Sequence, residues 1–259
     1  MPAAPYLSLV LACYNEEEIL AESFETIRET LDGLGRPYEI VFVDDVSRDR
    51  TREILREIVA KNPDLSLNVV LHETNKGRGA TVTDGFRAAR GEIAGYIDVD
   101  LEVHPRYIPS LVRAIEKGAD VAVVRRIYAF QLAALDRYFM SRGYSWLVRR
   151  MLGTSLRDTE TGYKLFRREA LLPVIDAILD PAWFWDTEFM VRAERRGLRI
   201  AEIPGAYVRR QDKTSTVRGL RDSFVYFFKL LAFRRAEAAR RRSARAGAPA
   251  AGAAGPDRR

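Results

Sequence analysis

Cysteine and histidine are scarce in this sequence, and long apolar runs are missing. Its 259 residues include one cysteine, Cys13, and two histidines, His72 and His104. One cysteine rules out a disulfide framework and is typical of a reducing compartment, and neither histidine lies in a context that predicts a Ser-His-Asp arrangement. No segment reaches the ~18 consecutive apolar residues of a membrane-spanning helix, and residues 1–6 do not resemble a leader. We therefore expect a cytoplasmic protein that is neither secreted nor integral to a membrane.

The formal net charge is +6, and the C-terminal segment carries this excess. Residues 234–259 contain eight arginines and two acidic residues, so residues 1–233 are balanced. A basic segment can bind nucleic acid, but this one has no aromatic side chains on which bases could stack. We therefore predict no nucleic-acid partner.

Short apolar runs and a helical pattern alternate through the first hundred residues. The runs at Leu7–Cys13, Ile40–Val43, Val69–Leu71 and Ile93–Ile97 are typical of parallel strands that are buried on both faces. After the first run, apolar residues recur at helical spacing from Leu20 to Leu34. Strands and helices that alternate in this way predict an α/β fold with a doubly wound, mostly parallel, Rossmann-like sheet.

The second half has weaker periodicity. We expect helices near residues 105–117, 131–151, 168–178 and 186–196, a strand near Arg199–Val208 and a C-terminal amphipathic helix at 217–235. Residues 236–259 are rich in Ala, Arg and Gly, so we expect them to be disordered. The predicted organisation is one domain at 1–216, the helix at 217–235 and the tail at 236–259.

Asp98, Asp100 and Glu102 follow the fourth apolar run at alternate positions. Ligands of doubly wound sheets bind beyond the carboxyl ends of the strands, and alternate residues of an extended segment share a face. Three converging carboxylates repel one another unless a cation neutralises them, and their oxygens suit Mg²⁺ or Mn²⁺ bridging a diphosphate. The segment predicts a metal site, with a solvated acidic turn as the alternative.

A glycine-containing segment at Asn75–Ala80 precedes a predicted helix. Glycines at such a place let backbone amides approach an anion, and Lys76 and Arg78 add positive charge. The segment matches neither the phosphate loop nor the Gly-x-Gly-x-x-Gly fingerprint. It predicts contacts with donor phosphates, with a simple turn as the alternative.

Four motifs, in order, resemble those of the family 2 inverting glycosyltransferases of GT-A fold. They are Ala12–Glu16, Val43–Thr51, Asn75–Gly79 and Asp98–Glu102. The second half is similar to one branch, the dolichyl- or polyprenyl-phosphate mannosyl- and glucosyltransferases. Its matching segments are Arg125-Arg126, Arg137–Gly143, Asp158–Lys164, Phe184–Glu188, and Arg210 with Ser215. The resemblance implies a metal-dependent enzyme that transfers a hexose, with mannose favoured over glucose, from GDP-mannose or UDP-glucose to a polyprenyl phosphate.

The motifs and the resemblance together imply roles for single residues. The donor nucleotide sugar would contact Tyr14, Glu16, Asp44, Asp45, Lys76, Arg78, Asp98 and Lys213. The metal ion, Mg²⁺ or Mn²⁺, would contact Asp98, Asp100 and Glu102, and the acceptor phosphate would contact Arg126, Arg137 and Ser141. Candidate catalytic residues are Asp100, Asp158, Asp186, Glu188 and Arg210. Four residues depart from the family pattern. Glu102 stands where this branch commonly has glutamine, and Ala12 where it has proline. Val46 stands where it usually has glycine or asparagine, and Thr216 where lysine often follows the serine.

The acceptor decides whether a general base is needed. An alcohol needs one, and Asp186 or Glu188 is the candidate. A phosphate is already an anion near neutral pH and needs arginines instead. The arginines between residues 125 and 142 favour phosphate unless they are exposed helix charges.

Three further alternatives follow from the sequence. The predicted helix at 217–235 combines phenylalanines and leucines with cations, which suits a peripheral helix on the inner face of a membrane, or one that packs against the core or a partner subunit. The alternative acceptor is a hydroxyl of a soluble saccharide or small natural product. The alternative enzyme class is a nucleotidyltransferase, but those usually have a glycine-rich loop where this chain has Tyr14–Glu18.

Overall fold

The structure is a computed structural model that describes residues 4–128, 135–209 and 219–246. The chain divides into two units, Met1–Thr214 and Ser215–Arg259. The first unit contains a sheet and its covering helices, and the second contains the helix α8.

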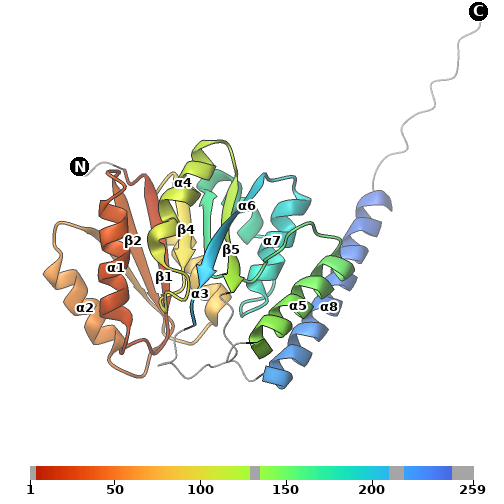
Figure 1. Ribbon diagram of the computed structural model, residues 1–259, viewed down its shortest axis with the longest axis horizontal. Helices are drawn as coiled ribbons and strands as arrows, with labels where there is room; N and C mark the ends of the chain where they lie inside the picture. Colours follow the sequence, from red (N-terminus) through yellow and green to blue (C-terminus); the bar gives the residue numbers. More distant parts are fainter. Residues whose placement is uncertain (1–3, 129–134, 210–218, 247–259) are drawn as a thin grey trace, which may run out of the picture. The chain divides into compact units, whose positions relative to one another are not determined.

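Among the described residues, seven strands form one sheet with the order β3-β2-β1-β4-β6-β5-β7 (Figure 1). They are β1 (Leu7–Cys13), β2 (Tyr38–Asp44), β3 (Ser66–Leu71), β4 (Ile93–Ile97), β5 (Val121–Tyr128), β6 (Tyr163–Arg167) and β7 (Ile200–Tyr207). Neighbouring strands are parallel except at β6, which is antiparallel to β4 and β5. Because β1 lies between β2 and β4, the carboxyl ends of these three parallel strands meet at one edge of the sheet.

Helices cover both faces of the sheet. They are α1 (Leu20–Asp32), α2 (Thr51–Lys61), η1 (Pro105–Tyr107) and α4 (Ile108–Glu116) on one face, and α3 (Arg78–Ala88), α6 (Arg168–Ile175) and α7 (Trp185–Arg195) on the other. Alternate residues of β1 pack on opposite sides: Leu9 and Leu11 join the core around Phe24, and Val10 joins the core around Phe86. The first unit also contains α5 (Leu135–Leu152). This architecture confirms the predicted doubly wound, mostly parallel sheet.

Both ends of β1 and β4 coincide with the predicted ends, whereas β2 and β3 are longer than predicted. The sequence does not predict β5 or β6, because charged residues break their apolar runs. Arg125 and Arg126 follow the apolar half of β5, and Lys164 lies within β6. Lys164 is nevertheless fully buried, because its ammonium group has buried polar partners in the folded chain.

The second unit contains α8, which covers Gly219–Ala246. The sequence predicts a helix that ends at 235 and a disordered tail after it. The helix continues to Ala246 because Ala and Arg, which dominate residues 236–246, are strong helix formers. No helix in the described part of the chain is long and apolar enough to cross a lipid bilayer.

Candidate active site

Asp98 and Asp100 lie in the turn that follows β4. The Asp98 N–H donates to the Gly162 carbonyl at 2.9 Å, which joins this turn to the segment before β6. Leu101 has a φ of 50°, and the Glu102 N–H donates to Asp100 Oδ1 at 3.2 Å. A Cβ atom at position 162 would lie 1.7 Å from Asp98 Oδ2, so only glycine fits beside this carboxylate.

The three acids predicted to bind a metal do not form a three-carboxylate cluster. The Tyr207 hydroxyl donates to Glu102 Oε2 at 2.5 Å, and Asp98 pairs with Arg78. Within the described residues, no group of three or more His, Cys, Asp or Glu side chains is placed to hold a metal ion. Asp98 and Asp100 still supply hard oxygen donors, and Mg²⁺ commonly binds one or two carboxylates together with substrate phosphates and water. These two aspartates therefore fit such an ion, while Glu102 is engaged by Tyr207.

Asp44 ends β2 and uses its buried carboxylate within the protein. It accepts the N–H groups of Val46 at 3.1 Å and Ser47 at 3.2 Å, and it pairs with Arg52 at 2.5 Å. Val46 has a φ of 65°, a left-handed conformation that glycine and asparagine adopt more easily than a β-branched residue. This conformation accounts for the family's preference for glycine or asparagine at the position.

The turn after β1 is joined to the turn after β2. The Asn15 N–H donates to Ser47 Oγ at 3.0 Å, and the Glu16 N–H donates to Thr51 Oγ1 at 2.8 Å. Tyr14, in the same turn, is 44% exposed. The predicted nucleoside contacts Tyr14 and Glu16 therefore lie at the same sheet edge as Asp44.

Asp45 holds the loop that precedes α3. Its carboxylate lies 2.8 Å from His72 Nδ1 and accepts the N–H groups of Lys76 at 2.8 Å and Gly77 at 2.9 Å. Burial by itself raises the pKa of Asp45, but His72 and these N–H groups outweigh it and keep that pKa below its ordinary value. Two of the loop amides predicted to bind an anion therefore bind Asp45.

The glycines of this loop permit close packing, which differs from their predicted role in approaching an anion. A Cβ atom at Gly77 would lie 2.9 Å from the Pro181 carbonyl oxygen, and one at Gly79 would lie 2.5 Å from Trp185 Cβ. Gly77 also has a φ of 90°, which L side chains rarely adopt. The two glycines thus allow the start of α3 to contact the segment that leads into α7.

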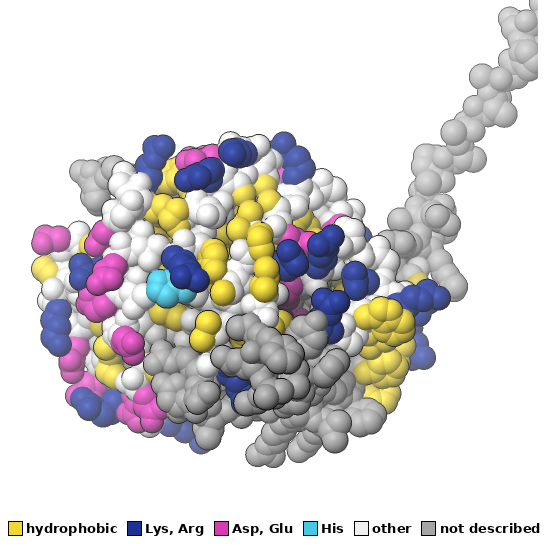
Figure 2. Space-filling model, in the orientation of Figure 1, with side chains coloured by type: hydrophobic (Ala, Val, Ile, Leu, Met, Phe, Trp, Pro, Cys, Tyr) yellow, Lys and Arg dark blue, Asp and Glu magenta, His cyan; other side chains and the backbone are white. Residues whose placement is uncertain are grey.

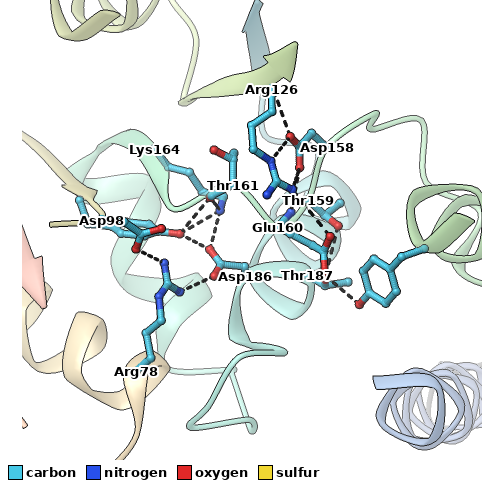
Figure 3. Close-up of polar contacts among 12 residues, drawn as sticks. Arg78, Asp98, Arg126, Asp158, Thr159, Glu160, Thr161, Lys164, Asp186 and Thr187 are labelled. Atoms are coloured by element: carbon cyan, nitrogen blue, oxygen red, sulfur yellow. Dashed lines mark hydrogen bonds and ion pairs between the residues drawn. The ribbon is translucent and has the colours of Figure 1, made fainter. Parts of the chain in front are cut away.

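A buried chain of charges connects Asp98 to α7 (Figure 3). Arg78 donates from Nη2 to Asp98 Oδ1 and from Nη1 to Asp186 Oδ2, both at 2.5 Å. Lys164 Nζ donates to Asp186 Oδ1 at 2.5 Å, and the Tyr96 hydroxyl donates to the same oxygen. Burial by itself raises the pKa of Asp186, but Lys164 and Arg78 outweigh it and hold that pKa below its ordinary value. Asp186 is therefore ionised and poorly suited to accept a proton.

Glu188, the second candidate base, is 1% exposed and lies in the first turn of α7. Its Oε1 accepts the Leu179 N–H at 3.0 Å and its Oε2 accepts the Asp180 N–H at 2.9 Å. Arg192 also pairs with Oε1 at 2.7 Å. Both carboxylate oxygens thus have protein donors, which is typical of a structural carboxylate.

A second cluster of charges contains Arg126, Asp158 and Glu160 (Figure 3). Arg126 donates from Nε to Asp158 Oδ2 at 2.8 Å and from Nη2 to Asp158 Oδ1 at 2.9 Å, and its Nη2 lies 3.7 Å from Glu160 Oε2. Burial by itself raises the pKa of Asp158, but Arg126 outweighs it and lowers that pKa. Burial raises the pKa of Glu160 to about 7, because the opposing attraction of Arg126 does not outweigh burial and the repulsion of Asp158. One guanidinium thus faces two carboxylates.

Beside this cluster lies a cavity of about 510 Å³, which we call the arginine cavity. Its lining residues are Arg125, Arg126, Ile127, Tyr128, Arg142, Ser145, Arg149, Arg157 and Asp158. Arg142, Ser145 and Arg149 are three and four residues apart on α5, so they share one face of that helix. Figure 2 shows basic side chains gathered to the right of the centre of the visible face. Five arginines against one acid make the lining suitable for a phosphate.

Only part of the predicted acceptor site can be compared with the arginine cavity. Arg126 lies in its wall, whereas the side chains of Arg137 and Ser141 lie outside the described residues, although α5 includes both positions. The candidate catalytic residue Arg210 and the predicted donor contact Lys213 also lie outside the described residues.

Two arginines of the cavity lining, Arg149 and Arg157, are not among the site residues predicted from the sequence. The seven-residue spacing from Arg142 could have indicated Arg149, because residues seven apart lie on one face of a helix. Arg157 follows α5 in an irregular segment, and no local pattern marks it.

A family and several named proteins are similar in sequence to most of this chain. Residues 8–173 match Glycosyl transferase family 2. The glycosyltransferase AglD of Haloferax volcanii is 35% identical over 203 residues, which are 76% of this chain and 32% of the relative. The dolichyl-phosphate beta-glucosyltransferase ALG5A of Trichomonas vaginalis is 31% identical over 218 residues, 78% of this chain and 66% of the relative. The chain thus spans 32% of the length of the first relative and 66% of the length of the second.

A solved structure shares the fold. Glucosyl-3-phosphoglycerate synthase of Mycobacterium tuberculosis, in complex with Mn²⁺, uridine diphosphate and glucosyl-3-phosphoglycerate, has a TM-score of 0.67 and 22% sequence identity over 90% of this chain and 80% of that chain. This likeness confirms the predicted GT-A fold. With the match over residues 8–173, the chain belongs to glycosyl transferase family 2.

Proposed function

We propose that this chain transfers a hexose from a nucleotide diphosphate sugar to a polyprenyl phosphate. The observation that carries this proposal is the arginine cavity, whose lining includes the Arg126–Asp158 pair. Figure 3 shows the Arg126–Asp158 pair beside the Asp186 cluster, so the acceptor and donor sites would be neighbours. The names of two relatives, an undecaprenyl-phosphate 4-deoxy-4-formamido-L-arabinose transferase of Edwardsiella ictaluri and the dolichyl-phosphate glucosyltransferase, support a polyprenyl phosphate acceptor.

The donor site lies at the carboxyl ends of β1, β2 and β4. In this proposal Tyr14 and Glu16 contact the nucleoside, and Asp98 and Asp100 hold Mg²⁺ or Mn²⁺ against the diphosphate. When bound, such an ion neutralises the charge that develops on the leaving diphosphate. Both GDP-mannose and UDP-glucose are candidate donors; the relative named as a glucosyltransferase supports glucose.

The acceptor site needs cations rather than a base. A phosphate oxygen is already anionic near neutral pH, so attack on the sugar requires positioning and not proton removal. Arg142, Arg149 and Arg157 can bind and orient the acceptor phosphate from the cavity wall. Asp186 and Glu188 are both engaged by cations, which disfavours the alternative of a hydroxyl acceptor activated by either carboxylate.

Peripheral attachment to the inner face of a membrane is part of this proposal. Phe227, Phe228 and Leu231 give α8 apolar side chains, and Lys229 and Arg234 give it cations. A helix of this composition can bind an anionic lipid surface.

The test measures transfer with a panel of nucleotide sugars, each with a short polyprenyl phosphate, a soluble saccharide or water. We expect one donor to give a lipid-phosphate sugar, and product formed only with the soluble saccharide would refute the acceptor. Arg149→Gln should raise KM for the polyprenyl phosphate about tenfold, because a charged hydrogen bond contributes about 1.5–3 kcal/mol. The matched control is Arg150→Gln, since Arg150 is the exposed neighbour on α5 and does not line the cavity. Equal KM values in both variants would show that the cavity does not bind the acceptor.

A further inference from the structure

Arg78 bridges two carboxylates that differ in their access to solvent. Its own side chain is 13% exposed, and its two Nη atoms pair with Asp98 and Asp186 at 2.5 Å each. The Asp186 side chain is 4% exposed and is also bound by Lys164, whereas the Asp98 side chain is 42% exposed. A cation that arrives from solvent therefore reaches Asp98 and not Asp186.

The four charged side chains that connect Asp98 to α7 balance one another before any ligand binds. Arg78 and Lys164 carry two positive charges, and Asp98 and Asp186 carry two negative charges. A divalent ion on Asp98 competes with the Arg78 guanidinium for the same carboxylate. If the ion takes it, Arg78 stays anchored on Asp186, and its Nη2 needs a new acceptor in a largely buried place.

We propose that Arg78 occupies the position of the divalent cation on Asp98 in the metal-free protein, and that it transfers its Nη2 hydrogen bond to the donor diphosphate when the cation binds. This exchange rests on the function proposed above. It couples the binding of the divalent cation to the binding of the donor diphosphate. The cation releases a guanidinium that only an anion can satisfy, and the diphosphate supplies that anion. By linkage, the diphosphate strengthens metal binding to the same degree.

The test compares Mn²⁺ binding by calorimetry in the wild type and in Arg78→Gln, with and without a nucleoside diphosphate. Without nucleotide, Arg78→Gln should bind Mn²⁺ about tenfold more tightly than the wild type, because Asp98 has lost its competing cation. With Mn²⁺ present, Arg78→Gln should bind UDP or GDP at least tenfold more weakly than the wild type. The matched control is Arg87→Gln, which removes a 59% exposed arginine from the same helix. This control should change neither affinity.

Opposite shifts in the two affinities separate exchange from a merely structural role, which would weaken both. Unchanged or weaker Mn²⁺ binding by a folded Arg78→Gln would overturn the exchange while leaving the proposed transfer reaction intact. If the wild type bound no Mn²⁺ or Mg²⁺ at all, both the exchange and the metal-dependent transfer would fail.

A second measurement does not depend on the fold of that variant. The Arg78 guanidinium carbon lies 5.2 Å from the centroid of the Trp183 ring, so movement of Arg78 should alter Trp183 fluorescence. Titration of the wild type with Mg²⁺ should change the emission, and the change should be absent in Trp183→Phe. Identical titration curves in the two proteins would contradict the exchange.

Discussion

Replacing Glu160 by glutamine should stabilise the protein at alkaline pH but not at acidic pH. Burial raises the pKa of Glu160 to about 7 from an ordinary value of 4.5. The folded state therefore retains a proton that the unfolded state loses between these two pH values. Because the unfolded state binds fewer protons in this window, the stability contributed by this group falls as pH rises from about 4.5 to about 7 and is constant above it. A glutamine side chain at this position would carry no charge at any of these pH values.

The size of the effect follows from the shift and from the exposure of the group. Each pKa unit corresponds to about 1.4 kcal/mol, and the Glu160 side chain is 27% exposed, so solvent screening reduces the full value. We expect the stability difference between Glu160→Gln and the wild type to grow by about 1–3 kcal/mol between pH 5 and pH 8. The gain arises because glutamine avoids a buried negative charge that Asp158 and Asp186 repel.

The assay is urea unfolding followed by circular dichroism at pH 5, 6, 7 and 8. Glu73→Gln is the control, because Glu73 is an exposed carboxylate at a loop position. A stability difference for Glu160→Gln that stayed constant across this range, or that shrank as pH rose, would refute the assignment of a raised pKa to Glu160.

Two further substitutions test the sheet edge. Gly162→Ala should displace Asp98, because the new Cβ would lie 1.7 Å from its Oδ2, and we expect lower thermal stability and loss of nucleotide binding by calorimetry. The control Gly143→Ala should retain both, because its new Cβ would have nothing within 4 Å. Normal nucleotide binding by Gly162→Ala would contradict the geometry. Val46→Asn should raise the melting temperature by about 2–4 °C, since relief of left-handed strain in a β-branched residue contributes about 1 kcal/mol. The control Val46→Ile keeps the strain. An equal rise of the melting temperature in both variants would argue against strain as the cause.

Local patterns in the sequence were sufficient for β1, β4 and the helix α1. The apolar runs that became β1 and β4 contain no charged residue, and the stripe from Leu20 to Leu31 follows a single helical period. The acids after β4 could be assigned to the edge where β1, β2 and β4 end, because parallel strands place their carboxyl ends together. These features depend on residues close in sequence, where periodicity carries the information.

Three features were decided only by tertiary structure. Lys164 interrupts an apolar run, and its burial in β6 is possible because Asp186, 22 residues away, neutralises it. Arg78 contacts Asp186 across 108 residues, a pairing that no spacing rule could indicate. Gly79 is needed because Trp185 occupies the space of its Cβ.

For the arginine cavity too, the sequence predicted one part and the tertiary structure decided the other. The sequence by itself predicted arginines for a phosphate acceptor. It also contains the spacing that puts Arg149 on one helix face with Arg142, although Arg149 was not among the predicted residues. Only the folded chain brings that face to Arg125 on β5 and to Arg157 in the segment after the helix. The physical reason is that helix periodicity is a local property, whereas the enclosure of one cavity by residues of α5 and β5 brings together residues distant in sequence.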